Sequence, residues 1–506
     1  MEVKVAALNE RGCTSTLASE TAPKYGPKGY NGSVKLDSSK VGVWACLIMR
    51  DEARNIPSCF SDLIPMVDGF VVCDTGSLDN SMEVARNCCG ELPLVLFSAN
   101  WHNYSHNRNI VLRRMDSVIR SKAERKTGLN LHEPITWEEY RQLCEHRWFA
   151  LVTDLDNRFH HQDSGRNGTP VLLERSSLVD DGYFIESRRG GSIYRTNNLL
   201  RIDPLGIERW SYVRSVHEYS DSLEPWCDMK VGEISGCYID YGCSGYRSRD
   251  VARALKDVIY LLFDDKLEPG DSRTTFYLAQ SYNEAGCTEK ARHYYKKRAE
   301  MKGTWASERY LSYLKLADLV DRASPGGEQE YLNWLYRGYE LGLKRFEIAY
   351  RICEYYRLHD MHRMAWQIGE PLLNVLEVDS SEFLVDQAVT GWKFWDILGV
   401  SAYYAGKKYH CYMLTLRALN CTLLRGGDRE RVHSNLELVE SGLTLEEKRR
   451  AVEQAAGRES GVENGAKVGT IVHGSSKPLY LKLVPGEGAE GIIRALLLES
   501  AVEVGQ

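Results

Sequence analysis

The sequence predicts an α/β domain with a mostly parallel sheet, followed by an all-α domain of paired helices. Continuous apolar runs alternate with short amphipathic stretches over residues 41–159, which is typical of β-α-β units whose strands are buried on both faces. Polar residues follow each run where its strand would end. From residue 248 the apolar period becomes helical and stays so to about residue 425.

We therefore divide the chain into four parts. A flexible leader is expected at residues 1–40, because this stretch is rich in Gly, Ser, Pro and Lys without periodicity. The α/β domain follows at 41–247 and the helical domain at 248–425. Residues 426–506 form a C-terminal extension of unknown role.

Composition is that of an ordinary globular protein. The net charge of −6 over 506 residues argues against a nucleic-acid partner. The fourteen cysteines contain no Cys-x-x-Cys pair, which argues against a zinc cluster or a disulfide framework. No apolar run is long enough for a signal peptide or a membrane span, so we expect a cytoplasmic protein.

The strands and helices of the α/β domain are predicted from the spacing of apolar residues and from the turn residues between them. Short runs of consecutive apolar residues predict strands, and runs with apolar residues on one face predict helices. The expected strands cover residues 41–49, 69–77, 92–99 and 148–152, and the expected helices cover 56–64, 80–89 and 106–115.

The strand at 148–152 leads directly into Asp154 and Asp156, whose carboxylates should emerge on the same side. Two carboxylates at the carboxyl end of a sheet strand can hold a hard divalent cation against nucleotide phosphates. Asp is also common in plain surface turns, so the pair gains weight only from its neighbours. His160 and His161 are weaker ligand candidates, because a polar loop is enough to explain them.

Three segments, CLIMRDEARNI, VVCDTGSLDNSMEVA and the Asp154-Leu155-Asp156 strand end, together resemble an inverting glycosyltransferase of the large family 2 with the GT-A, Rossmann-like nucleotide-sugar fold. In that family a Lys-Asn-Glu-Glu-like turn, an Asp-x-Gly-Ser-x-Asp, an Arg-Asn at a helix start and an Asp-x-Asp occur in this order. The resemblance covers residues 41–245. The chain departs from it in the long interval before Asp154, which contains the helical piece ITWEEYRQLC, and in Asn157, where relatives often have Glu.

The resemblance implies an enzyme that moves a sugar, with inversion, from a nucleotide-diphosphate sugar to a hydroxyl of an acceptor. The nucleotide would most often be uridine, and Mn²⁺ or Mg²⁺ would be the cofactor. Asp74 would receive the base, and Arg108 with Asp154 the ribose-phosphate region. The implied donor site comprises Met49, Asp51, Asp74, Asp79, Arg108 and Asp154, and the implied metal ligands are Asp154, Asp156 and His217.

The Val216-His217-Glu218 segment resembles a Val-His-Glu segment of the same glycosyltransferase subgroup. A neutral imidazole can complete the coordination of a cation already held by carboxylates. An adjacent carboxylate can deprotonate an acceptor hydroxyl, so we expect Glu218 to be the catalytic base. If this segment is extended, the two side chains point to opposite sides.

The helical region repeats one spacing, with offsets of three, four, five and four residues. Small, aromatic, turn, small and bulky residues in this order are typical of a tetratricopeptide repeat, in which small residues let two helices approach. A generic helical bundle is the alternative. A homodimer through the helical domain is a further expectation. The repeated positions are Ala279, Tyr282, Gly286, Ala291 and Tyr295; Cys353, Tyr356, Asp360, Ala365 and Gly369; and Gly399, Ala402, Gly406, Cys411 and Thr415.

Two other functions stay open. A non-catalytic repeat scaffold could carry a decayed glycosyltransferase domain, and Asn157 could mark that decay, but both aspartates and the His217-Glu218 pair are retained. A nucleotidyltransferase shares the sheet and the acidic pair, but no Gly-rich basic loop follows the first strand. The sequence does not indicate whether the acceptor is a protein, peptide, glycan or lipid.

Overall fold

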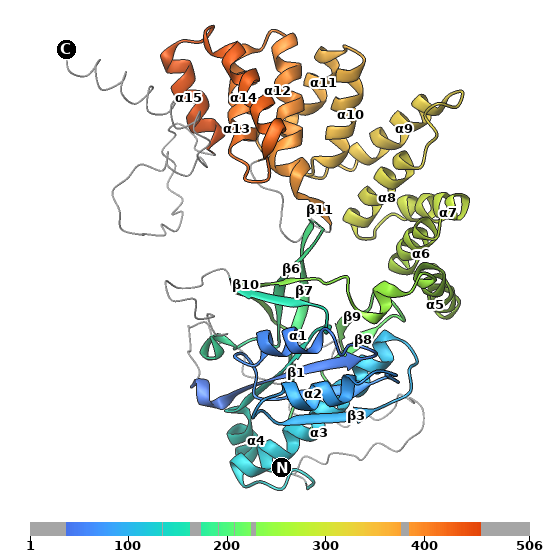
Figure 1. Cartoon of the computed structure of the whole chain (residues 1–506), viewed down its shortest axis with the longest axis vertical. Helices are drawn as coiled ribbons and strands as arrows, with labels where there is room; N and C mark the ends of the chain where they lie inside the picture. The colour runs from blue at the N-terminus through green and yellow to red at the C-terminus, as the bar shows by residue number, and fades with distance from the viewer. Residues whose placement is uncertain are drawn as a thin grey trace, which may run out of the picture. The chain divides into compact units, whose positions relative to one another are not determined.

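The computed structural model describes residues 37–133, 135–161, 174–190, 192–206, 208–223, 229–375 and 384–456. They form two compact units (Figure 1). Unit 1 contains the described residues up to 189 and from 195 to 286, and unit 2 contains those at 190–194 and from 287 onward. The predicted boundary at 247/248 therefore falls inside unit 1. The predicted leader, except 37–40, and the chain from 457 onward lie outside the described residues.

Unit 1 is built on a sheet with the strand order β3-β2-β1-β4-β7-β6-β10-β5. The first three strands and β4 run parallel, and β7 is antiparallel to β4. β8 and β9 form a separate antiparallel pair. The bounds are β1 Val41–Met49, β2 Phe70–Asp74, β3 Leu94–Ser98, β4 Arg147–Val152, β5 Arg158–His161, β6 Gly182–Arg189, β7 Ser192–Ile202, β8 Trp210–Val213, β9 Tyr219–Ser222 and β10 Val231–Asp240.

Helices cover both faces of the parallel part of the sheet. Val43 and Leu47 of β1 point into a core shared with α1 and α2, whereas Trp44 and Cys46 point into a core shared with α3. This alternation explains why β1 is a continuous apolar run. The helical elements of unit 1 are η1 Ser38–Lys40, α1 Ile56–Leu63, α2 Ser81–Cys88, α3 Tyr104–Thr127, α4 Trp137–Cys144, η2 Arg175–Ser177, η3 Tyr246–Arg249, α5 Arg253–Leu267 and α6 Ser272–Glu284.

α3 is longer than the sequence suggested. The predicted helix ended at residue 115, but Ile119 and Ala123 continue its buried face to Thr127. Charged side chains fill the positions between these apolar residues and weaken the periodic pattern. The interval that departs from the glycosyltransferase pattern therefore contains an extension of α3, to Thr127, and then the separate helix α4.

The strand order reverses between β1 and β4, because β2 and β3 lie on one side of β1 and β4 on the other. In open α/β sheets, ligands bind at the carboxyl ends of the strands at such a switch point. The polar turns after β1 and β4 therefore occupy the position where a ligand site is expected.

In unit 2, each helix from α7 to α13 packs against the next, and both α14 and α15 pack against α13. α10 also contacts α12, as expected for stacked helix pairs. β11 pairs with residues 192 and 193 of β7. The bounds are α7 Thr288–Glu300, α8 Ala306–Asp318, α9 Gly327–Tyr339, α10 Glu347–Leu358, α11 His362–Gly369, η4 Glu370–Leu372, β11 Val385–Asp386, η5 Val389–Lys393, α12 Phe394–Tyr404, α13 Lys408–Leu419, α14 Gly426–Glu440 and α15 Leu445–Ala455.

The predicted repeat positions lie where the pattern requires them in the pairs α10–α11 and α12–α13. Cys353 and Cys411 are buried between the paired helices, and burial raises the pKa of the Cys411 thiol to about 11. The turn residues Asp360 and Gly406 have positive φ angles of 60° and 77°. The first predicted repeat spans α6 and α7, which belong to different units.

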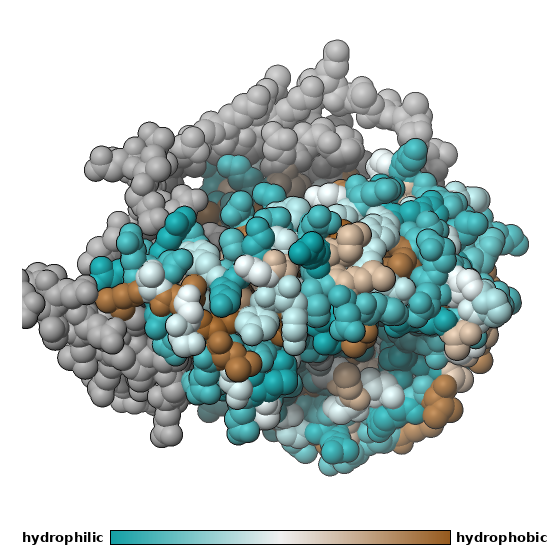
Figure 2. Space-filling model, turned by 90° about the horizontal axis from the view of Figure 1, so that it is seen from above, coloured by the Kyte–Doolittle hydropathy of each residue, from teal (hydrophilic) through white to brown (hydrophobic). Residues whose placement is uncertain are grey.

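On the face drawn in Figure 2, hydrophilic residues predominate and apolar residues form small separate groups. Within the described residues, every helix is too short or too polar to cross a membrane.

A buried ion pair inside unit 2 provides a stability test. Arg298 and Glu308 are buried, and two guanidinium nitrogens of Arg298 lie 2.8 and 3.0 Å from one carboxylate oxygen of Glu308. Arg298→Met leaves a buried carboxylate without its cation and should lower the free energy of unfolding of unit 2 by about 3–5 kcal/mol. Chemical denaturation measures this change. The control Arg363→Met, at an exposed site on α11, should change it by less than about 0.5 kcal/mol.

A double variant, Arg298→Met with Glu308→Met, should recover most of the loss, because the uncompensated charge is gone. A loss in the double variant as large as in the single variant would show that packing, and not charge, sets the cost.

Candidate functional site

Asp74 lies at the carboxyl end of β2, and its side chain is buried. Its carboxylate accepts hydrogen bonds from the backbone N–H groups of Gly76 and Ser77, each at 3.3 Å. Met49 ends the neighbouring strand β1, and its carbonyl accepts the N–H and the hydroxyl of Thr75 at 2.8 and 2.9 Å. The two residues predicted to border the nucleotide are thus held side by side by one turn.

Asp51 and Asp79 join the turns after β1 and β2. The Asp51 carboxylate accepts the N–H groups of Leu78 and Asp79 at 2.5 and 3.1 Å. The Asp79 carboxylate in turn accepts the N–H of Ala53 at 3.2 Å and hydrogen bonds from Ser81. Asp51 has a φ angle of 50°, which these contacts stabilise. Both carboxylates therefore hold the loops that border the site.

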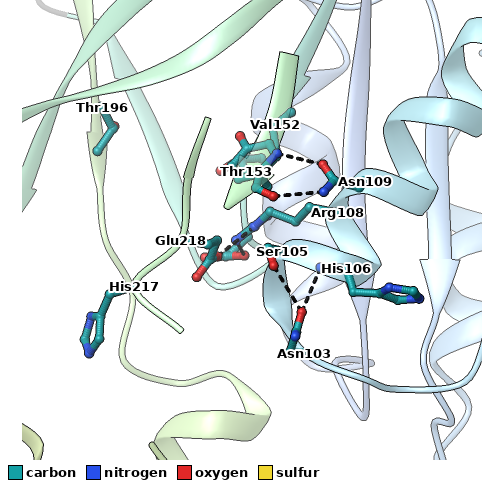
Figure 3. Close-up of polar contacts among 12 residues, drawn as sticks. Asn103, Ser105, His106, Arg108, Asn109, Val152, Thr153, Thr196, His217 and Glu218 are labelled. Atoms are coloured by element: carbon teal, nitrogen blue, oxygen red, sulfur yellow. Dashed lines mark hydrogen bonds and ion pairs between the residues drawn. The ribbon is translucent and has the colours of Figure 1, made fainter. Parts of the chain in front are cut away.

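Arg108 connects α3 with β4 and with the segment that carries Glu218 (Figure 3). Asn103 caps α3 by accepting the N–H of His106 at 2.8 Å. The buried Arg108 guanidinium donates to Asp154 at 2.7 Å and to Glu218 at 2.8 Å. Burial alone would lower the pKa of Arg108, but the two carboxylates raise it well above its ordinary value.

Asp156 lies beside a carboxylate that the sequence reading did not single out, Glu52. Burial and the neighbouring charge of Asp154 raise the pKa of Asp156, although the N–H of Gly245 donates to it at 3.0 Å. Burial also raises the pKa of Glu52, which accepts the N–H of Tyr246 at 2.7 Å. Its position directly after Asp51 at a strand end was the signal that could have identified Glu52.

The loop after β10 packs on Asp156 and requires small residues. A Cβ atom at Gly242 would lie 1.9 Å from the carbonyl oxygen of Asp156, and one at Gly245 would lie 2.9 Å from its carboxylate. Buried Asn157 accepts the N–H of Gly242 at 3.3 Å and donates to the Thr153 hydroxyl at 3.1 Å. An ionised Glu could accept but not donate, so the departure at Asn157 has a structural explanation.

His217 does not lie with Asp154 and Asp156. Its ring stacks on Tyr277 of α6, with a centroid distance of 3.8 Å, and Figure 3 shows it directed away from Glu218. Burial, and then nearby arginines led by Arg247, lower the pKa of His217 well below its ordinary value, so the ring is neutral.

The predicted ligand set is therefore not assembled. Within the described residues, no three His, Cys, Asp or Glu side chains lie close enough together to hold a metal ion. The backbone at His217 is not extended, because its φ angle is 53°, so the condition under which adjacent side chains alternate does not hold here. His160 pairs with Asp240 at 3.0 Å and stacks on Tyr238. Stacking on Tyr277, sixty residues later in the chain, is the contact that separates His217 from the aspartates.

Comparisons with known proteins found no matching family model and no matching curated protein, and only weak structural similarity. Among solved structures, BtubC (BKLC) from P. vanneervenii is similar at 17% identity and a TM-score of 0.29, over 46% of this chain and 100% of that one. A thermophilic TPR protein from Thermus thermophilus has 13% identity and a TM-score of 0.24, over 37% and 92%. MamA has 14% identity and a TM-score of 0.23, over 40% and 98%. The paired-helix architecture of unit 2 is shown by its own helix contacts.

The raised pKa of Asp156 predicts how its removal changes stability with pH. In the folded protein the charged form is disfavoured, so Asp156→Asn should raise the midpoint of thermal unfolding at pH 7. The carboxyl is protonated in both the folded and the unfolded chain below its ordinary pKa of about 3.9, so the two midpoints should approach each other as the pH falls and converge only below that pKa. Asp154→Asn, which weakens the contact with Arg108, should lower the midpoint at pH 7. A lower midpoint for Asp156→Asn would show that the Gly245 hydrogen bond outweighs burial.

Proposed function

We propose that unit 1 is a metal-dependent inverting glycosyltransferase that uses a nucleotide-diphosphate sugar. The observation that carries the proposal is the meeting of Asp154, Asp156 and Arg108 at the carboxyl edge of the sheet, at the switch between β1 and β4. The order of the motifs that resemble family 2 glycosyltransferases supports the proposal, because each occupies a strand end or the start of a helix.

In this proposal the nucleotide base lies at the end of β2, beside Asp74, and the diphosphate lies toward the end of β4. Burial and the neighbouring charge of Asp154 raise the energetic cost of the charge on Asp156, and a divalent cation would offset that cost. The carboxylates therefore fit Mn²⁺ or Mg²⁺, with donor phosphate oxygens as further ligands, whereas His217 does not belong to the set. When bound, such a cation offsets the charge of the departing diphosphate.

Glu218 is the proposed base. Its side chain is only 11% exposed, and the Arg108 contact fixes its carboxylate. Inversion needs a base on the acceptor side of the sugar, where it can accept the proton of the attacking hydroxyl. Arg108 acts here as a positioning residue, because it holds Glu218 and Asp154 on one guanidinium and so sets the distance between the base and the donor site.

The most direct test is donor turnover. The full-length protein should release nucleotide from at least one member of a panel of nucleotide sugars when manganese is present, and chelation should stop the release. Asp156→Asn should reduce release by ~10²-fold or more, because the cation loses its ligand. The matched control Glu83→Gln removes an exposed carboxylate on α2 and should leave release unchanged. Full nucleotide release in excess chelator would show that the reaction needs no metal ion.

Two further variants distinguish the role of Glu218 as the catalytic base from the role of His217, which contributes only to packing. Glu218→Gln keeps the size of the side chain and a hydrogen bond to Arg108, so donor binding should persist while transfer to an acceptor falls ~10²-fold or more. His217→Phe retains stacking on Tyr277 and should keep donor binding. Calorimetric titration with the nucleotide and manganese measures binding. Loss of donor binding in His217→Phe would show that His217 is a ligand of the metal ion.

A further inference from the structure

One helix of unit 1 presents a continuous apolar stripe to solvent. α5 buries Val258 and Leu261, whereas five large apolar side chains on its opposite side are exposed, as is Val251 in the turn just before the helix. These six residues lie within a stretch of 17 and make up six of the 22 exposed large apolar residues of the described chain, so scattered surface exposure does not account for them. The stripe, with exposed fractions, consists of Val251 (104%), Leu255 (53%), Ile259 (67%), Leu262 (40%), Phe263 (60%) and Leu267 (67%).

The inner side of α5 is fixed to unit 1 by buried polar contacts. The Asp264 carboxylate accepts the N–H and the hydroxyl of Ser215 at 2.9 and 2.6 Å. Asp257 accepts a hydrogen bond from Arg247 at 2.6 Å. Because these contacts set the orientation of the helix, the stripe is a preformed surface that needs no rearrangement to bind a partner.

Five of the six stripe residues are spaced symmetrically about Ile259. Leu255 and Phe263 lie four residues to either side of it, and Val251 and Leu267 lie eight residues to either side. A two-fold axis through Ile259 would place Leu255 of one copy against Phe263 of the other. A two-fold interface requires this kind of self-complementary surface. We propose that α5 is the contact surface of a homodimer, in which a second copy of this chain packs antiparallel on the stripe.

Area and charge favour a second copy over a membrane. The exposed parts of the six side chains amount to roughly 600–700 Å² per copy, close to the about 800 Å² per partner of a standard interface, and flanking polar residues can supply the rest. Asp257 and Asp264 face inward, so the charges around the stripe are those of Arg253, Lys256, Asp265 and Lys266. Arg253 pairs with Glu284 at 2.6 Å and Lys256 with Asp250 at 2.5 Å, and Asp265 offsets Lys266, so no excess of positive charge is left to attract an anionic membrane. Lys256 would lie opposite Leu262 of the second copy and could cover it with its aliphatic stem.

The test is the mass of the full-length protein in solution, measured by light scattering after gel filtration over a range of concentrations. The wild type should have twice the 57.6 kDa mass of a single chain. Ile259→Glu places two like charges against each other at the axis and should raise the dissociation constant ~10²-fold or more. The control Leu438→Glu, at a 70% exposed site on α14, should leave the dimer intact. Unchanged circular dichroism would show that each variant is folded.

Three results would overturn the proposal. One is a monomeric wild type that floats with anionic vesicles, which would assign the stripe to a membrane. Another is a monomer in which chemical cross-linking joins Lys256 to Lys477 or Lys482, which would assign it to the C-terminal part of the same chain. The third is a dimer that persists in Ile259→Glu, which would place the interface elsewhere.

Discussion

The buried guanidinium of Arg108 is the contact on which the candidate site depends. A cation removed from water must be compensated by nearby anions, and Arg108 meets this requirement with Asp154 and Glu218 at 2.7 and 2.8 Å. These three residues belong to a helix, to the end of a strand and to a segment 64 residues further along the chain. One buried charge therefore fixes the relative positions of the donor side and the acceptor side of the proposed reaction.

The packing around this ion pair explains why several residues with no proposed catalytic or binding role are needed near the site. The segment before Glu218 is anchored through Ser215 to Asp264 of α5, so the helix pair α5–α6 is part of the architecture of unit 1. The loop after β10 covers Asp156 closely enough to exclude a side chain at position 242. Asn157 supports that loop with an amide that donates and accepts. The site is thus shaped by local packing around the carboxylates.

Much of the fold could be predicted because the sequence patterns follow directly from burial and close packing. β1 is apolar throughout since helices cover both of its faces, and its predicted bounds match those of the structure. The helix pairs α10–α11 and α12–α13 were predictable because close helix packing demands small residues at fixed offsets. The length of α3, the role of Asn157 and the stacking of His217 on Tyr277 depend on contacts between distant segments. Contacts between distant segments leave no signal in the local sequence pattern. For this reason His217 was predicted as a metal ligand, although in the structure it stacks on Tyr277.

We propose that a cation and a nucleotide diphosphate bind together beside Asp156. Anomalous diffraction at the manganese edge, from crystals grown with Mn²⁺ and uridine diphosphate, tests it most directly. We expect a manganese peak within coordination distance of the Asp156 carboxylate, with the diphosphate on the other side of the ion and the uridine toward Asp74. A peak on His217 without Asp156, or a nucleotide bound away from the ends of β1 and β4, would contradict the claim.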